Sequence, residues 1–304
     1  IVVMNPQNGE IYAMISQPDF DPNTMKQNWQ SIVENPDSPF LNRATSGLYA
    51  PGSTFKVVTA VAGLENPNVS KSYDCKGSFT VEGYTLEDYG GKAHGKIGLE
   101  EALVKSCNSY FAQLGLQVGR QELGGVCERF MMNKDIPFDL PVKTSKFAHG
   151  EELKKTDIAA SSIGQGKTLV TPLNMAMVAS AIANEGNMVK PILVKEILSP
   201  KGHLIRLNDT ETISQVTDPL IANQVKNMMV EVVKRGTGTN ASIGNIRVAG
   251  KTGTAENPTG KSHAWFIGFA PADEPKIAIS VILESDGTTG GKTAAPIARQ
   301  IMIC

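Results

Sequence analysis

The sequence predicts an α+β fold, a mixed α/β structure built around one central antiparallel sheet of five strands. Two short apolar runs rich in β-branched residues lie near the start of the chain, three more lie near its end, and helical patterns fill the stretches between them. Strands from both ends can share one sheet if the intervening helices pack on it. With 304 residues, of which 41% are hydrophobic and 19% are charged, the chain could form one large domain or two, and a sheet shared by both ends favours a single domain over residues 1–304.

The first elements are a hairpin and a loop region. Residues 1–5, "IVVMN", and residues 10–16, "EIYAMIS", are separated by the turn sequence "PQNG", which is typical of paired antiparallel strands. Residues 19–49 are rich in Pro, Asn and Asp, so we expect loops and short helices there.

The first long helix is predicted to begin at Ser53. Pro51 and Gly52 precede it as helix breakers, and the apolar residues of the run that ends at Leu64 cover nearly the whole circumference of a helix. This pattern indicates a helix that is buried on most sides.

Further helices and the remaining strands follow a polar, Gly-rich stretch over residues 71–98. Helical periodicity and end signals predict helices over residues 99–106, 109–119, 171–186 and 219–236. The residues "SCN" form the corner between the first two of these. Apolar runs and turn signals predict strands over residues 246–256, 264–272 and 276–285, and then a last helix over residues 293–303.

Charge and motif content argue against several functional classes. Lys and Arg total 29 against 30 Asp and Glu, which gives a net charge of -1, so we expect no nucleic-acid partner. The sequence contains no CxxC or HExxH, so we expect neither a metal nor another cofactor, and a pairing of Cys75 with Cys127 stays open. "GKT" occurs three times, but each copy lacks the earlier glycine of a phosphate-binding loop.

Ser53 and Lys56 form the first of three short motifs that carry chemistry. At positions i and i+3 of a helix, their side chains lie on one face, one turn apart. A serine hydroxyl becomes an effective nucleophile when a base takes its proton, and burial together with the helix dipole would keep Lys56 neutral enough to be that base. The alternative is a capping serine followed by a lysine that reaches solvent.

Ser106 and Asn108 of "SCN" form the second motif. At a corner between helices, both side chains can point into a cleft, where a hydroxyl relays a proton and an amide holds a substrate amide. A helix stop followed by a helix cap is the alternative explanation.

The third motif, "KTGTAE", lies on a predicted strand. Lys251 and the hydroxyls of Thr252 and Thr254 would make a carboxylate-binding edge. Gly253 between them would let a ligand come close to the backbone.

In the order SxxK, SxN and KTG, the three motifs are the signature of enzymes that recognise penicillin. The chain resembles the transpeptidase domain of penicillin-binding proteins, within the serine β-lactamase and D,D-peptidase superfamily, and most of all the class B, elongation or division type. The resemblance runs nearly end to end, in blocks such as "NRATSGLYAPGSTFK", "SSIGQGKTLVTPLNMA" and "VAGKTGTAE". It implies the β-lactamase/transpeptidase fold, with an all-helical subdomain beside the sheet.

The resemblance also implies a peptidoglycan D,D-transpeptidase. Ser53 would attack the penultimate carbonyl of a D-alanyl-D-alanine stem peptide with Lys56 as general base, and the acyl group would pass to an acceptor amine to crosslink the cell wall. Backbone N–H groups of Ser53 and Thr254 would form the oxyanion hole. Ser106 would carry a proton to the leaving amine, Asn108 would hold the side-chain amide of the donor, and the KTG residues would bind the terminal carboxylate. β-Lactam antibiotics would acylate Ser53 and inhibit the enzyme.

Three alternatives share parts of this signature. A D,D-carboxypeptidase uses water as the acceptor and shares every motif. Class D β-lactamases, and the non-catalytic β-lactam sensor domains that resemble them, place an apolar residue where Asn108 stands. Class A β-lactamases need a deacylating Glu in an ExxLN sequence, and "EELKK" at residues 151–155 lacks that spacing.

The start of the chain and the resemblance imply a location and partners. The chain begins without Met inside an apolar run and contains no run long enough to span a membrane, so we expect a longer protein with an N-terminal module and a membrane anchor. The expected location is the extracytoplasmic face of the bacterial cell membrane. The expected partners are peptidoglycan stem peptides, β-lactams, a membrane glycosyltransferase and other cell-wall synthesis proteins.

Overall fold

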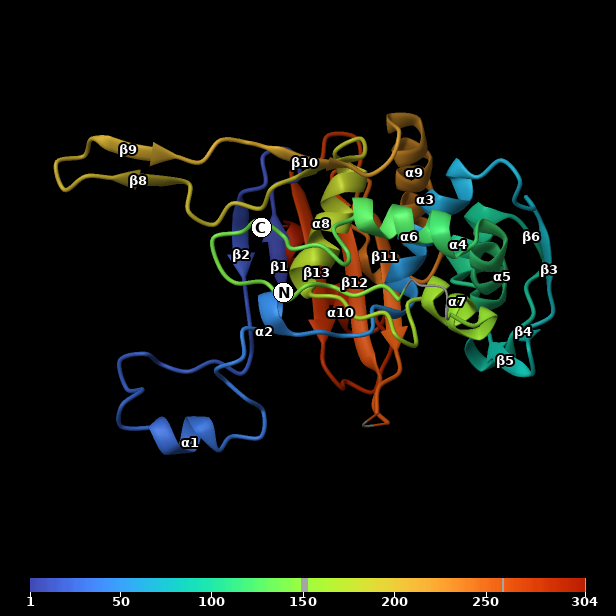
Figure 1. The fold of residues 1–304 in the computed structure, drawn as a ribbon, viewed down its shortest axis with the longest axis horizontal. Coiled ribbons are helices and arrows are strands. Elements are labelled where there is room, and N and C mark those ends of the chain that lie inside the picture. Colours follow the sequence, from blue (N-terminus) through green and yellow to red (C-terminus); the bar gives the residue numbers. More distant parts are fainter. Residues whose placement is uncertain (149–152, 259, 304) are drawn as a thin grey trace.

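A five-stranded antiparallel sheet forms the centre of the molecule, as the sequence predicts (Figure 1). The structure is a computed structural model that describes residues 1–148, 153–258 and 260–303, so Glu151 of "EELKK" and Cys304 lie outside it. The spatial order is β11-β12-β13-β1-β2, which places strands from both ends of the chain side by side. The strands are β1 (Val2–Met4), β2 (Ile11–Met14), β11 (Ala249–Ala255), β12 (His263–Ala270) and β13 (Ile277–Leu283).

Helices cover both faces of this sheet. Helix α8 (Pro172–Ala183) is buried along its whole length on one face, and α10 (Ala294–Ile303) packs on the other. Alternate side chains of β12 point to opposite faces, so Trp265 belongs to the core on the α8 side and Phe266 to the core under α10. The predicted cap of α8 is confirmed, because the Thr171 hydroxyl accepts a hydrogen bond from the backbone N–H of Asn174 at 3.1 Å.

An all-helical region lies beside the β11 edge of the sheet (Figure 1). Its helices are α3 (Lys56–Glu65), α4 (Leu99–Lys105), α5 (Asn108–Val118), α6 (Arg120–Arg129), α7 (Lys155–Ser162) and α9 (Pro219–Arg235). Helix α9 joins this region to the sheet, because it packs on both α4 and β11. Helices α6 and α7 were not predicted, since "RQELGGVCER" contains two adjacent glycines and "KTDIAASS" is made mainly of small and polar residues.

Four small strand pairs lie outside the central sheet and were not predicted. Within residues 71–98, β3 (Tyr73–Cys75) pairs with β6 (Gly95–Ile97), and β4 (Ser78–Val81) pairs with β5 (Tyr84–Glu87). Strand β7 (Asn187–Val189) pairs with β10 (Thr212–Gln215), and β8 (Glu196–Leu198) pairs with β9 (Leu204–Leu207). In Figure 1 the β8–β9 hairpin extends away from the body. Strands of three or four residues with exposed side chains leave little hydrophobic pattern to detect.

Short helical segments complete the fold. They are α1 (Trp29–Val33), α2 (Arg43–Ser46) and the 3-10 turns η1 (Gly52–Phe55), η2 (Tyr89–Gly91) and η3 (Thr239–Ala241). Within the described ranges, no helix has both the length and the apolar character needed to cross a membrane.

Candidate active site

Ser53 lies half-buried in the turn η1, immediately before helix α3. This turn is pressed against strand β11. A Cβ on Gly52 would come within 2.6 Å of the carbonyl oxygen of Thr254, and a Cβ on Gly253 would come within 2.8 Å of the carbonyl oxygen of Pro51. Gly253 is therefore required by the packing of the Ser53 turn, and not only by the approach of a ligand as predicted. The backbones of Pro51 and Gly52, directly before Ser53, meet those of Gly253 and Thr254 at this contact.

Lys56 is completely buried at the start of α3, directly behind the Ser53 turn. Its Nζ donates hydrogen bonds to the carbonyl oxygen of Ser106 at 2.7 Å and to Oδ1 of Asn108 at 2.6 Å, and lies 3.4 Å from Oγ of Ser106. Burial lowers the pKa of Lys56 to about 7. A neutral amine has two N–H donors, which the two short contacts use, so its lone pair is left to accept a proton. The predicted burial of Lys56 is confirmed, and the alternative of a lysine that reaches solvent is wrong.

Ser106 connects Lys56 to a second buried lysine. Lys251 Nζ lies 2.9 Å from Oγ of Ser106 and donates to the carbonyl oxygen of Thr252 at 2.9 Å. Lys251 is also fully buried, and both this burial and the charge of Lys56 hold its pKa well below the usual lysine range. Ser106 ends helix α4 in a left-handed conformation, φ +59°, which turns its hydroxyl into the space between the lysines. The structure thus brings residues of all three motifs together.

Asp88 holds the SxN corner in place, a role that the sequence analysis missed. Its carboxylate accepts hydrogen bonds from the backbone N–H groups of Asn108 and Ser109 at the start of α5, and from the Ser109 hydroxyl at 2.5 Å. Burial alone would raise the pKa of Asp88, but these bonds and one from the Cys75 thiol lower it below its usual value. Nδ2 of Asn108 donates to the carbonyl oxygen of Glu87 at 2.8 Å, so the Asn108 side chain is fixed on both sides.

Thr237 is a second site residue that the motifs did not indicate. Its Oγ1 lies 2.6 Å from Oγ1 of Thr252, on the strand that carries KTG. Thr237 stands in the sequence "GTGTNA" after helix α9, and only the resemblance drew attention to that block. The pair of hydroxyls fixes the side chain of Thr252 at the proposed carboxylate-binding edge.

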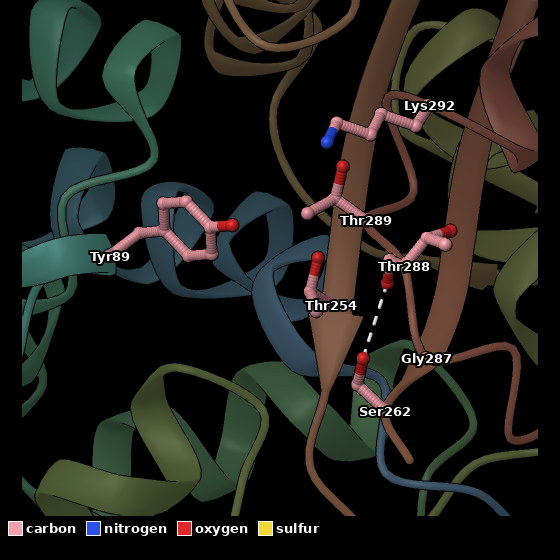
Figure 2. Close-up of a pocket in the computed structure, with 7 residues that line it drawn as sticks. All are labelled: Tyr89, Thr254, Ser262, Gly287, Thr288, Thr289 and Lys292. Carbon is pink, nitrogen blue, oxygen red and sulfur yellow. Dashed lines mark hydrogen bonds between the residues drawn. The ribbon is translucent and has the colours of Figure 1, made fainter.

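A cavity of about 270 Å³ opens beside this network. Its lining residues, drawn in Figure 2, are Tyr89, Thr254, Ser262, Gly287, Thr288, Thr289 and Lys292. Tyr89 directly follows Asp88 and faces strand β11 from the other side of the opening, and its side chain is strongly exposed. Hydroxyl groups and one ammonium provide the polar character of the walls, so the cavity suits a polar, anionic ligand.

Four side chains next to the SxN corner could hold a metal ion. They are Cys75, Asp88, His94 and Cys107, and their donor atoms lie within 4.8 Å of one another. Two thiols, an imidazole and a carboxylate are a donor set that suits tetrahedral Zn²⁺. The sequence does not reveal this group, because its members are spread over 33 residues (75 to 107) without a CxxC. A zinc ion here would supply charge that holds Asp88, and with it the corner.

The structure does not pair Cys75 with Cys127, the possibility that the sequence left open. Cys75, Cys107 and Cys127 are all free and buried. Sγ of Cys75 lies 3.5 Å from Sγ of Cys107, while Cys127 lies on α6. Cys75 therefore has Cys107, and not Cys127, as its cysteine neighbour.

Comparisons with known proteins agree with this geometry. The family described as "Penicillin binding protein transpeptidase domain" matches residues 1–303. Peptidoglycan D,D-transpeptidase PbpA of Mycolicibacterium smegmatis is 35% identical over 98% of the chain, and the chain spans 65% of that relative's length. The solved penicillin G acyl-enzyme complex of penicillin-binding protein A from M. tuberculosis is 34% identical, with a TM-score of 0.92 over 99% of this chain and 73% of that one.

A more distant solved structure has the same fold. It is the complex between penicillin-binding protein PBP2 and MreC from Helicobacter pylori, which is 25% identical with a TM-score of 0.83 and covers 99% of this chain and 59% of that one. The profile match over nearly every residue, the strand order and the three converging motifs lead to the same assignment, which confirms the predicted family. The chain belongs to the penicillin-binding protein transpeptidase family.

Proposed function

We propose that this chain is a serine acyltransferase that takes its acyl group from peptides ending in D-alanyl-D-alanine and crosslinks peptidoglycan. The observation that carries the proposal is the arrangement of two buried lysines, Lys56 and Lys251, on either side of the Ser106 hydroxyl next to the Ser53 turn. Two buried amines around one hydroxyl cost the fold free energy, so a purely structural role would be poorly served by them. The lowered pKa of Lys56 suits proton transfer near neutral pH.

The first half-reaction forms an acyl-enzyme. Neutral Lys56 takes the proton of the Ser53 hydroxyl while the Ser53 oxygen bonds to the penultimate D-alanine carbonyl carbon. The backbone N–H groups of Ser53 and Thr254 stabilise the oxyanion that develops. The bond to the terminal D-alanine then breaks, and its amine takes a proton from the hydroxyl of Ser106, which the ammonium of Lys56 replaces.

The second half-reaction runs the same steps in reverse with a new amine. The acceptor amine bonds to the acyl carbonyl carbon and gives up its proton through Ser106 to Lys56. The Ser53 oxygen leaves and recovers its proton from Lys56, so the enzyme returns to its starting state. One peptide bond has been exchanged for another, and no outside energy source is needed.

Recognition of the donor follows from the edge of β11. Lys251, Thr252 and Thr254 would bind the terminal carboxylate, and Asn108 would hold the side-chain amide of the donor. A β-lactam has the same carboxylate and carbonyl arrangement, so it would acylate Ser53. The penicillin G acyl-enzyme of the M. tuberculosis relative supports this reading.

Similarity to the peptidoglycan D,D-transpeptidase of M. smegmatis favours a transpeptidase over a D,D-carboxypeptidase or a β-lactamase. Both alternatives need water to attack the acyl-enzyme efficiently, whereas a transpeptidase must protect it until an amine arrives. Asn108 also argues against class D β-lactamases and the β-lactam sensors that resemble them, because its polar side chain contacts Lys56.

We also propose a location at the extracytoplasmic face of the cell membrane and partners among cell-wall synthesis proteins, including a membrane glycosyltransferase. The H. pylori relative in complex with MreC supports a protein partner of this class. Cys75, Asp88, His94 and Cys107 would hold a zinc ion that stabilises the SxN corner and takes no part in the chemical steps.

A donor peptide ending in D-alanyl-D-alanine, incubated with the protein and an excess of a D-amino acid, tests this function. We expect release of D-alanine together with the exchanged peptide, and no product with Ser53→Ala. Release of D-alanine with only the hydrolysed peptide would favour a carboxypeptidase. Turnover by Ser53→Ala at the native rate would remove Ser53 from the proposed role.

A further inference from the structure

Lys292 provides the one charge among the seven residues that line the cavity in Figure 2. Its side chain projects along the cavity beside Thr289. Lys292 is exposed and forms no ion pair with any carboxylate in the described part of the chain, whereas many other lysines do, as Lys195 does with Glu10 at 2.9 Å. An ammonium without a protein counter-charge, in a cavity without a lining carboxylate, is suited to an anionic ligand.

The turn that carries Lys292 is packed against strand β11, which carries the KTG motif. A Cβ on Gly290 would come within 2.5 Å of the carbonyl oxygen of Gly253, and a Cβ on Gly291 would come within 2.5 Å of the carbonyl oxygen of Thr237. The carbonyl oxygen of Gly291 accepts a hydrogen bond from Nδ2 of Asn240 at 2.8 Å. These close contacts hold the backbone of Lys292 at a set position relative to β11.

This position is at the carboxylate end of the site. The Cβ position of Gly291 is 3.7 Å from Cγ2 of Thr252, and Thr252 is paired through its hydroxyl with Thr237. Lys292 therefore directly follows a residue that contacts the edge of β11 that would bind the terminal carboxylate of the donor.

The chemistry of the exchange connects this end of the site with the acceptor. The leaving D-alanine carries its amine and its carboxylate on the same carbon. An acceptor amine attacks from the side that the leaving amine has vacated, because the second half-reaction is the reverse of the first. An acceptor that also carries a carboxylate beside its amine would then place that carboxylate near Thr252 and Lys292.

We propose that Lys292 is a specificity-determining residue that selects acceptors bearing a carboxylate on the carbon that carries the attacking amine. The inference rests on the proposed acyl transfer and deepens it. The D-centre of a meso-diaminopimelate stem has this arrangement, and the side-chain amine of a lysine stem does not. The terminal carboxylate of the donor uses the same edge before it leaves, so the acceptor step must be measured separately from acylation.

The test compares two acceptors on one acyl-enzyme. The protein is acylated with an N-acyl-D-alanyl thioester, and the acyl-enzyme is offered D-alanine or D-alaninamide at equal concentrations of free amine. The two acceptors differ only in the carboxylate, so the ratio of their aminolysis rates reports its recognition. Mass spectrometry of the products gives this ratio for the native protein, Lys292→Gln, Lys292→Arg and the surface control Lys276→Gln.

We expect the native protein to prefer D-alanine, and Lys292→Gln to reduce the ratio about fivefold, as the loss of one partly exposed charge pair would. Lys292→Arg keeps the charge and should keep the ratio within about twofold, as should Lys276→Gln. An unchanged ratio in Lys292→Gln, with a normal acyl-enzyme, would overturn the inference while leaving the proposed function intact. If the native protein forms no acyl-enzyme, the proposed function fails and this inference fails with it.

Discussion

The pH dependence of acylation should follow the protonation of Lys56. Acylation needs Lys56 neutral, and its pKa is lowered to about 7 by burial. The neutral form of Lys56 then makes up nearly all of the protein at pH 8 and about 1% of it at pH 5, two units below the pKa. We therefore expect the second-order rate constant for acylation by benzylpenicillin to fall about tenfold per pH unit below 7, and about 100-fold between pH 8 and pH 5.

At high pH we expect the acylation rate to fall as the pH rises. Lys251 must carry its charge to bind the carboxylate of the drug, and burial and the charge of Lys56 lower its pKa. Loss of the proton from Lys251 should therefore reduce acylation as the pH rises, which makes the profile bell-shaped. Neutral Lys56 helps Lys251 to keep its proton, because the neutral amine no longer repels the ammonium of Lys251.

The assay is the rate of adduct formation, followed by intact mass from pH 5 to pH 10. Circular dichroism at each pH verifies that the protein stays folded, so that loss of rate reports chemistry. A profile that is flat from pH 5 to pH 9 would refute the assignment of Lys56 as the general base. A rate that keeps rising tenfold per pH unit up to pH 10, as an ordinary lysine with a pKa of 10.5 would give, would instead show that burial does not lower the pKa of Lys56.

Three further predictions concern packing and the metal group. Gly253→Ala places a methyl group against the carbonyl of Pro51 and should lower the free energy of unfolding by about 1–3 kcal/mol and slow acylation, as read by thermal unfolding and intact mass; native values for both would contradict the packing described. Asp88→Asn weakens the charge-assisted bonds to the start of α5 and should cost about 1.5–3 kcal/mol in chemical denaturation; a loss below about 0.5 kcal/mol would argue against its anchoring role. The purified protein should carry about one zinc ion per chain by plasma mass spectrometry, and Cys75→Ser should carry much less; equal zinc in both proteins would exclude this site.

The central sheet and the buried helices were predictable because their signals are strong. Strands β11 and β12 are almost entirely buried and β13 is buried along its centre, and the apolar runs around Trp265 and Ile279 therefore stand out in the sequence. Helix α8 is likewise buried throughout and has a Thr-Pro start. The short exposed strands have neither property, so they were missed.

Some site residues could be predicted from local sequence, and others depend on long-range contacts. Ser53 and Lys56 are related by one helical turn, and a local motif reveals them. Asp88 accepts hydrogen bonds from the start of a helix that begins 20 residues later. Short strands that could not be predicted from the sequence place it there. The metal group and the position of Lys292 depend on such tertiary contacts too, so they needed the structure.

The role of Ser53 as the nucleophile is tested most directly by the mass of the protein over time after mixing with benzylpenicillin, with Ser53→Ala measured alongside. We predict a one-to-one adduct that persists for many minutes, maps to the peptide containing Ser53 and is missing from Ser53→Ala. An adduct of equal stoichiometry on Ser53→Ala, or no adduct on the native protein, would contradict the claim that Ser53 is the nucleophile. An adduct that disappears while the drug is consumed would identify a β-lactamase instead of a transpeptidase.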